Sequence, residues 1–154
     1  MKLAEFESKW KNEGKTEEGT TKLFLIGVLE YLDGNKEAEK MVAMTLPKNK
    51  IDRNIKYYLK NQFSKSKNIA GSYLGGTPEN DYKYSYDHSL EINKKSSKKG
   101  DKESKIFVQS GGKASASPVH LKKNNQGYWK LFNVSSLATG VQKSKSEQEK
   151  AGDF

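Results

Sequence analysis

The sequence predicts an α+β fold in which about three N-terminal helices pack on one face of a four-stranded antiparallel sheet. Up to about residue 66, apolar residues recur with the spacing of one helical face. After residue 71 they alternate with polar residues, as in a half-buried strand. Because the helices come first and the strands second, the class is α+β and not α/β. The 154 residues suit a single domain. We place it at residues 1–141, with a helical part at about 3–66 and a sheet part at about 71–141.

The helical part is predicted to begin with a short amphipathic segment at residues 3–12. Phe6 and Trp10 are four positions apart there and therefore share one helical face. Residues 12–21 are polar and contain two glycines, so we expect a break. The next segment, residues 22–32, is apolar on almost every side, which is typical of a central buried helix.

Two more helices are expected before the sheet. One covers residues 36–45 and ends before Pro47, because the residue preceding a proline avoids helical geometry. The other has Asn49 as its expected N-cap and a continuous apolar face from Ile51 to Phe63.

The sheet part is predicted from segments with a period of two and from the short turns that join them, which require antiparallel neighbours. The four expected strands are residues 82–93, 106–109, 118–122 and 128–134. The lysine-rich segment 94–105 reads as a loop, and residues 142–154 read as a polar, mobile tail. Helices on a curved sheet are also similar to the cone-shaped folds of the nuclear-transport-factor-2 type. In that alternative, Tyr84 and His88 point into an enclosed pocket.

The charge is strongly positive and almost all of it is lysine. There are 28 basic and 19 acidic residues, for a net charge of +9, and Arg53 is the single arginine. Lysine suits phosphate contact without base readout, so an anionic partner such as nucleic acid is one hypothesis. The candidate patch comes from the helix after residue 49 and from the 94–105 loop, and it consists of Lys50, Arg53, Lys56, Lys60, Lys94, Lys95, Lys98 and Lys99.

We find no catalytic set, metal site or cofactor motif in the sequence. The chain has no cysteine, and its two histidines lie far apart. We expect His88 to be half-buried on a strand face and His120 to be exposed, opposite Val119 and Leu121. The first residues lack the apolar run of a secretion signal, and residues 23–29 are too short to span a bilayer. A cytoplasmic protein without a membrane partner is therefore expected.

The segment 71–82 is the most distinctive part of the sequence. Its glycines, proline and asparagine specify a fixed backbone path, which is typical of a structural corner or of a loop that contacts a ligand. The candidate partner-binding residues of this loop are Tyr73, Gly76, Thr77, Pro78, Glu79, Asn80 and Tyr82.

These residues resemble the Y-x-x-G-A-T-P-E-N-x-Y box of a family of small, uncharacterised bacterial proteins of unknown function. The segment from Phe107 to Leu121 resembles the family's S-G-G and S-P segment, although the family's basic residue before the second proline is missing. The segment from Gly127 to Leu137 resembles its C-terminal strand with S-S-L. The resemblance implies a bacterial origin and a shared fold, and it assigns no catalytic residue.

Three hypotheses of function follow from the sequence. The first is a non-enzymatic domain that recognises another protein through the 76–82 corner, as an adaptor, immunity or secretion-associated protein. The second is non-specific binding of nucleic acid by the lysine-rich surface. The third is a small-molecule-binding or enzymatic pocket in a cone-shaped fold. The sequence predicts no oligomeric state.

Overall fold

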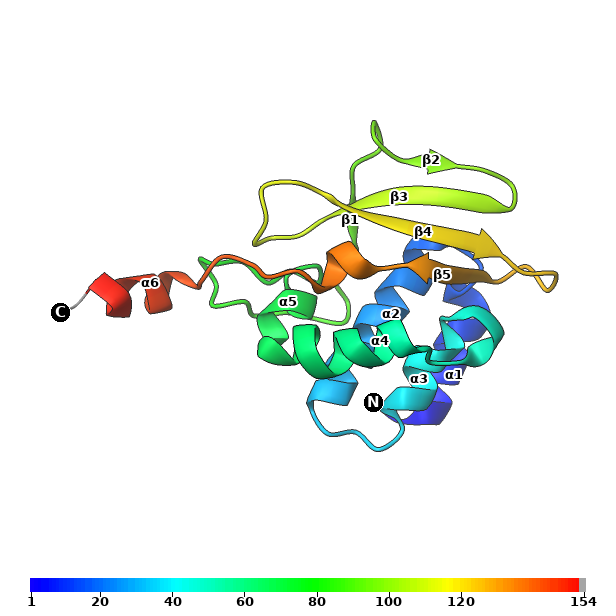
Figure 1. The fold of residues 1–154 in the computed structure, drawn as a ribbon, viewed down its shortest axis with the longest axis horizontal. Helices are drawn as coiled ribbons and strands as arrows, with labels where there is room; N and C mark the ends of the chain where they lie inside the picture. Colours follow the sequence, from blue (N-terminus) through cyan, green and yellow to red (C-terminus); the bar gives the residue numbers. More distant parts are fainter. Residues whose placement is uncertain (153–154) are drawn as a thin grey trace.

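The computed structural model describes residues 1–152 and has helices on one face of an antiparallel sheet, which confirms the α+β class (Figure 1). The helices are α1 (Leu3–Glu13), α2 (Glu17–Leu32), α3 (Ala38–Met44), α4 (Arg53–Tyr57), α5 (Lys67–Gly71) and α6 (Lys145–Gly152), with short turns η1 (Pro47–Asn49), η2 (Tyr58–Gln62), η3 (Phe63–Lys65) and η4 (Ser135–Ala138). The strands are β1 (Glu91–Ile92), β2 (Lys98–Lys99), β3 (Glu103–Gln109), β4 (Ser117–Lys123) and β5 (Trp129–Asn133).

The polar break expected at residues 12–21 is reduced to a tight corner between α1 and α2. The Thr16 side chain accepts a hydrogen bond from the Gly19 amide at 3.0 Å and so caps α2 one turn earlier than its apolar residues begin. The prediction was wrong here because a helix can begin with a polar turn that carries no apolar signal. The apolar run that follows is buried on nearly all sides, as expected.

The helix expected after Asn49 begins later and is not regular. Asp52 is its N-cap and accepts a hydrogen bond from the Ile55 amide at 2.9 Å. Asn49 does not cap it, because its backbone is left-handed (φ 53°) and its side chain accepts a hydrogen bond from Lys130. The apolar face from Ile55 to Phe63 is realised as α4, a π-helical turn (η2) and a 3-10 turn (η3) in succession.

The sheet is antiparallel throughout, in the order β1-β3-β4-β5, and β2 also pairs with β3. β1 and β2 pair with the two ends of β3, so the segment expected to be only a loop contributes a short edge strand. At the other side of the sheet, β5 pairs with β4 and has no strand on its outer edge. Its Leu131 amide donates to the Thr45 carbonyl and its Trp129 amide to the Gly14 carbonyl, both at 2.9 Å.

The strand predicted at residues 82–93 is wrong except for β1. Tyr82 is buried and Tyr84 and Tyr86 are half-buried, while the residues between them are exposed, so the alternation in burial is real. No strand pairs with residues 82–90, however. The Tyr86 hydroxyl donates to Glu30 on α2 at 2.6 Å, which holds the segment against the helices. His88, expected to be half-buried, is exposed.

The inner face of the sheet and the helices share one core. Inward side chains of β3, β4 and β5, among them Ile106, Val119 and Leu131, are buried in the same cluster as Leu25 and Phe63. This packing fills the face on which a cone-shaped fold has its pocket, so that alternative is wrong. Within residues 1–152, no helix has both the length and the apolar character needed to cross a membrane.

Residues 142–152 follow the domain boundary that we placed at residue 141. They run along the 71–82 segment and end in α6, which projects from the body of the molecule (Figure 1). The Tyr82 hydroxyl donates to the Gln142 carbonyl, and the Lys145 amide donates to the Pro78 carbonyl at 2.8 Å. The beginning of the expected tail is therefore in contact with the loop.

Candidate functional site

The tip of the 71–82 loop is a turn that its own side chains hold in place. The Asn80 side-chain oxygen accepts hydrogen bonds from the Thr77 amide (2.9 Å) and the Lys83 amide (3.0 Å). Its side-chain nitrogen donates to the Gly75 carbonyl at 3.0 Å, and the Thr77 hydroxyl accepts from the Asn80 amide. The turn residues recognised in the sequence therefore specify a rigid corner.

Most of the candidate partner-binding residues of this loop face the interior. Tyr73 is 1% exposed and Tyr82 is 3% exposed, and Pro78 is also buried. Gly76 is buried as well, and a Cβ there would lie 2.9 Å from the Gly71 carbonyl oxygen and 3.0 Å from the Tyr82 Cα. Thr77 is half-buried, so Glu79 and Asn80 are the two candidates with exposed side chains.

Behind the loop, a lysine bonds to several groups of the surrounding segments. The Lys113 ammonium donates to the Tyr73 hydroxyl (2.7 Å), the Ser136 carbonyl (2.8 Å) and the Thr139 hydroxyl (2.6 Å). Burial lowers the pKa of Lys113 to about 8, and burial raises the pKa of Tyr73 to about 12 against the effect of its hydrogen bond to Ser117. Tyr73 and Ser117 are buried. The hydrogen bonds of the Lys113 ammonium join the loop to the β3–β4 connection and to η4.

The candidate basic patch is divided between two regions of the surface. Lys50, Arg53, Lys56 and Lys60 are exposed around α4, in the helical layer. Lys94, Lys95, Lys98 and Lys99 are exposed around β2, at the far edge of the sheet (Figure 1). Lys99 also forms an ion pair with Glu18. The sheet separates the two groups, so they do not form one continuous binding surface.

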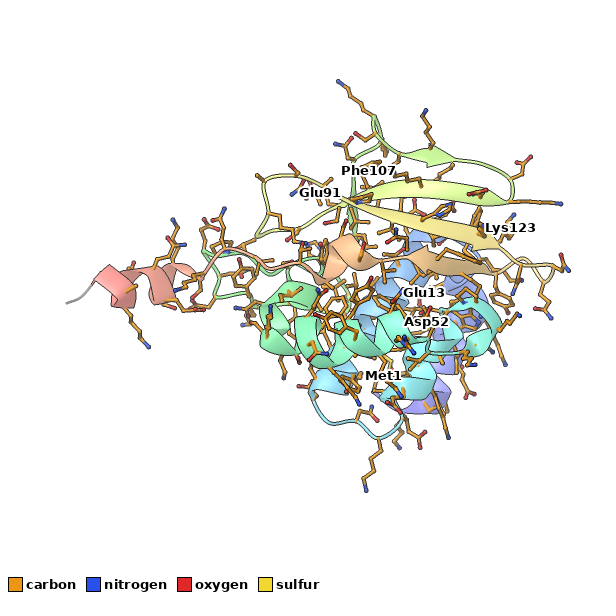
Figure 2. All side chains as sticks on the ribbon, in the orientation of Figure 1. Met1, Glu13, Asp52, Glu91, Phe107 and Lys123 are labelled. Atoms are coloured by element: carbon orange, nitrogen blue, oxygen red, sulfur yellow. The ribbon has the colours of Figure 1, made fainter. Side chains whose placement is uncertain are left out.

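A different group of lysines surrounds a groove at the β4–β5 end of the sheet. We call it the lysine–aromatic groove, and its volume is about 910 Å³. Figure 2 shows Lys123 at this end of the molecule, opposite α6. The groove is lined by Trp10, Pro47, Lys48, Asn49, Lys122, Lys123, Asn124, Gln126, Tyr128, Lys130 and Phe132. Four of these residues are lysines and none of them is acidic.

The strand register concentrates this charge. Lys122 on β4 is directly opposite Lys130 on β5, and like charges in that position destabilise a sheet. The Lys130 ammonium donates hydrogen bonds to the Met44 carbonyl (2.6 Å) and to the Asn49 side-chain oxygen (2.5 Å). Burial lowers the pKa of Lys130 to about 8, so the surroundings of this ammonium disfavour its charge.

Aromatic rings form the second component of the groove. The rings of Trp10 and Tyr128 are stacked, with centroids 5.2 Å apart and planes 14° apart. The Lys130 ammonium lies 5.0 Å from the Trp10 ring, and the Lys15 ammonium lies 4.1 Å from the Tyr128 ring. This stack is a preformed wall in which cations and rings already contact one another.

The backbone at the rim of the groove is unusual. Among residues 1–152, the non-glycine residues with positive φ fall into two pairs, Lys48–Asn49 and Asp81–Tyr82. The first pair lies at the groove and the second in the 71–82 loop. Left-handed backbone is unfavourable for a lysine and is found preferentially where a site requires it. Here it turns Asn49 toward Lys130.

Sequence reasoning did not find this groove, although parts of its signal are visible. Lys122 and Lys123 precede a turn, and Tyr128, Lys130 and Phe132 alternate along the next strand. Their grouping requires the β4–β5 register, and Trp10 and Lys48 are added only by the packing of α1 and η1 against β5.

The fold and the groove together define an α+β domain with a basic, aromatic surface site. The chain matches the model of a family described as "Domain of unknown function (DUF6935)" over residues 1–145, and it belongs to this family. The matched region includes every residue of the groove and the whole 71–82 loop. Comparison with curated proteins and with solved structures gave no match.

Proposed function

We propose that the protein is a non-enzymatic binding domain and that the lysine–aromatic groove binds a polyanion. The observation that carries this proposal is the gathering of four lysines, with no acidic residue in the lining, around one groove. An anion bound there would offset the repulsion between Lys122 and Lys130. It would also favour the charged form of Lys130, which burial disfavours.

The chemistry of the lining supports binding rather than catalysis. The groove residues include no histidine, serine or carboxylate that could form a nucleophile–base pair. Lysines, amides and rings are groups that hold an anionic ligand by charge, hydrogen bonds and stacking.

The experiment compares two variants that remove the same number of charges. The first is Lys48→Gln/Lys122→Gln/Lys123→Gln in the groove, and the matched control is Lys94→Gln/Lys95→Gln/Lys98→Gln at the β2 edge. Binding of a labelled thymidine oligonucleotide of about 12 nucleotides, a length within the usual site sizes, is measured by fluorescence anisotropy at low salt.

We expect the groove variant to bind at least about tenfold more weakly than the unsubstituted protein, because each lost phosphate contact reduces the release of counterions. The control should bind almost as well as the unsubstituted protein. Equal losses in the two variants would contradict the proposal and indicate binding by net charge alone. Absence of binding by the unsubstituted protein would also contradict it.

Recognition of another protein by the 71–82 loop is a second proposal, supported by the exposed acidic tip of a rigid turn. Glu79 and Asp81 are exposed there, and the Asn80 hydrogen bonds fix the backbone between them. Glu79→Lys reverses a charge without touching the turn. The unsubstituted protein and this variant are each used to capture partners from nuclease-treated lysate. The proposal predicts that the variant loses a protein that the unsubstituted protein captures, and an unchanged set of captured proteins would contradict it.

A further inference from the structure

On the basis of the proposed function, we infer that the polyanion is single-stranded nucleic acid and that Phe132 stacks on one of its bases. Phe132 is on β5 and 50% exposed. A ring left half open to water contributes only part of the burial free energy that an aromatic side chain can give to folding. It provides what a planar ligand needs, namely a ring face that is not packed in the core.

Phe132 occupies a central place in the surface hollows of this region. It lines the lysine–aromatic groove and also an adjoining cavity of about 420 Å³. The two share Pro47, Lys48 and Phe132, so they meet at this ring. The second cavity is lined by the apolar side chains of Leu46, Ile55 and Tyr58 and also by Lys50 and Asp52. Together they form a path on both sides of Phe132, which suits an extended chain with several repeating units.

The surroundings of the ring combine stacking with charge. The Lys122 ammonium lies 4.7 Å from the centroid of the Phe132 ring. A base that stacked on this face would displace the ammonium toward the neighbouring phosphate, where it forms an ion pair. Trp10 and Tyr128 already stack on each other and each has a lysine ammonium near its ring. Phe132 also has a lysine near its ring, but within residues 1–152 no aromatic ring stacks on it.

This arrangement favours a single strand over the other polyanions. A duplex hides the faces of its bases, so it would use the lysines and leave Phe132 without a partner. An acidic peptide would also satisfy the lysines, but glutamate and aspartate side chains carry no ring to stack. A single strand presents both phosphates and free base faces.

The test compares ligands that differ only in their bases. An oligothymidylate and an abasic oligonucleotide of the same length carry the same phosphates, and a polyglutamate peptide of matched charge is the third probe. Three variants are measured with each probe: Phe132→Ala, Phe132→Leu, which keeps an apolar side chain without a ring, and Phe132→Trp. Tyr57→Ala is the control, because Tyr57 is 53% exposed but lies on α4, outside both hollows.

We expect the unsubstituted protein to bind oligothymidylate about 5- to 150-fold more tightly than the abasic strand, the range for one stacked base. Phe132→Ala and Phe132→Leu should remove this difference, whereas Phe132→Trp and Tyr57→Ala should keep it. Thermal unfolding of each variant checks that it remains folded, and Phe132→Trp keeps the test valid if the smaller side chains destabilise the protein.

The outcomes separate this inference from the proposed function. Equal binding of the thymidine and abasic strands, with loss of both in the groove lysine variant, would overturn base stacking and leave polyanion binding intact. Binding of polyglutamate as tightly as oligothymidylate would also overturn it, in favour of an acidic peptide. If none of the three probes binds, the proposed function itself fails.

Discussion

Removal of two groove lysines should halve the salt dependence of oligonucleotide binding. The groove has four lysines, of which Lys48, Lys122 and Lys123 are exposed and Lys130 is buried. If each contacts one phosphate of a single strand, the slope of log K against log salt is about −2.8, at about −0.7 per contact. The dissociation constant should therefore rise about 50-fold when salt increases from about 50 mM to about 200 mM. In Lys122→Gln/Lys123→Gln, the slope should be about −1.4 and the increase about sevenfold.

The assay is a titration of labelled oligothymidylate at several salt concentrations, followed by anisotropy at pH 7, where Lys130 is largely charged because its pKa is about 8. Lys94→Gln/Lys95→Gln removes the same charge elsewhere and should keep the slope of the unsubstituted protein. An equal decrease in slope in both double variants would refute the reasoning, because the ligand would then respond to the field of the whole protein and not to the groove.

Three further predictions concern the fold. Burial alone would raise the pKa of Glu30, but hydrogen bonds from the N-terminal amine, Tyr86 and Asn35 outweigh it and lower the pKa. This stabilisation is therefore complete above the unfolded pKa near 4.5 and is lost as the pH falls through the folded value. Glu30→Gln should flatten the acid side of the stability curve measured by urea unfolding, and an unchanged curve would contradict this. Asn80→Ala should lower the free energy of unfolding by about 1–2 kcal/mol because it leaves turn amides without their acceptor. The exposed Asn125→Ala should change it by less than about 0.5 kcal/mol. Gly27→Ala places a Cβ 2.9 Å from Val42 Cγ2. The strain should outweigh the higher helix propensity of alanine, so calorimetry should show a free energy of unfolding lower by about 1–2 kcal/mol. A stabilised variant would show that α2 and α3 separate easily.

The elements that the sequence predicted well are those whose partner is implied by the pattern itself. The strands β3, β4 and β5 follow one another through short connections. Each segment with alternating burial therefore has its pairing strand next to it in the sequence. The segment after residue 82 alternates equally well, but its tyrosines are buried against helices, as the bond from Tyr86 to Glu30 shows. A period of two records which side chains are covered, and it does not record whether another strand provides hydrogen bonds.

The candidate sites differ for a similar reason. The turn residues around Asn80 produce a strong local signal, and the structure uses them to build the turn itself. The groove has a weak local signal because its residues come from α1, η1, β4 and β5. Asparagine tolerates left-handed backbone, but the lysine before it gives no sign of one. Nothing near Trp10 in the sequence indicates that it stacks on Tyr128. Such grouping is a property of tertiary packing alone.

The way in which β5 ends the sheet also limits how the protein can associate. A free strand edge is a template for another chain, and proteins that leave one open risk polymerisation. Here the carbonyls of Gly14 and Thr45 already accept the Trp129 and Leu131 amides of β5, and the opposite edge consists of two-residue strands, one of them a pair of lysines. Neither side can readily be extended by a foreign strand, so the protein is protected against edge-to-edge aggregation, and any partner must be held by side chains rather than by strand addition.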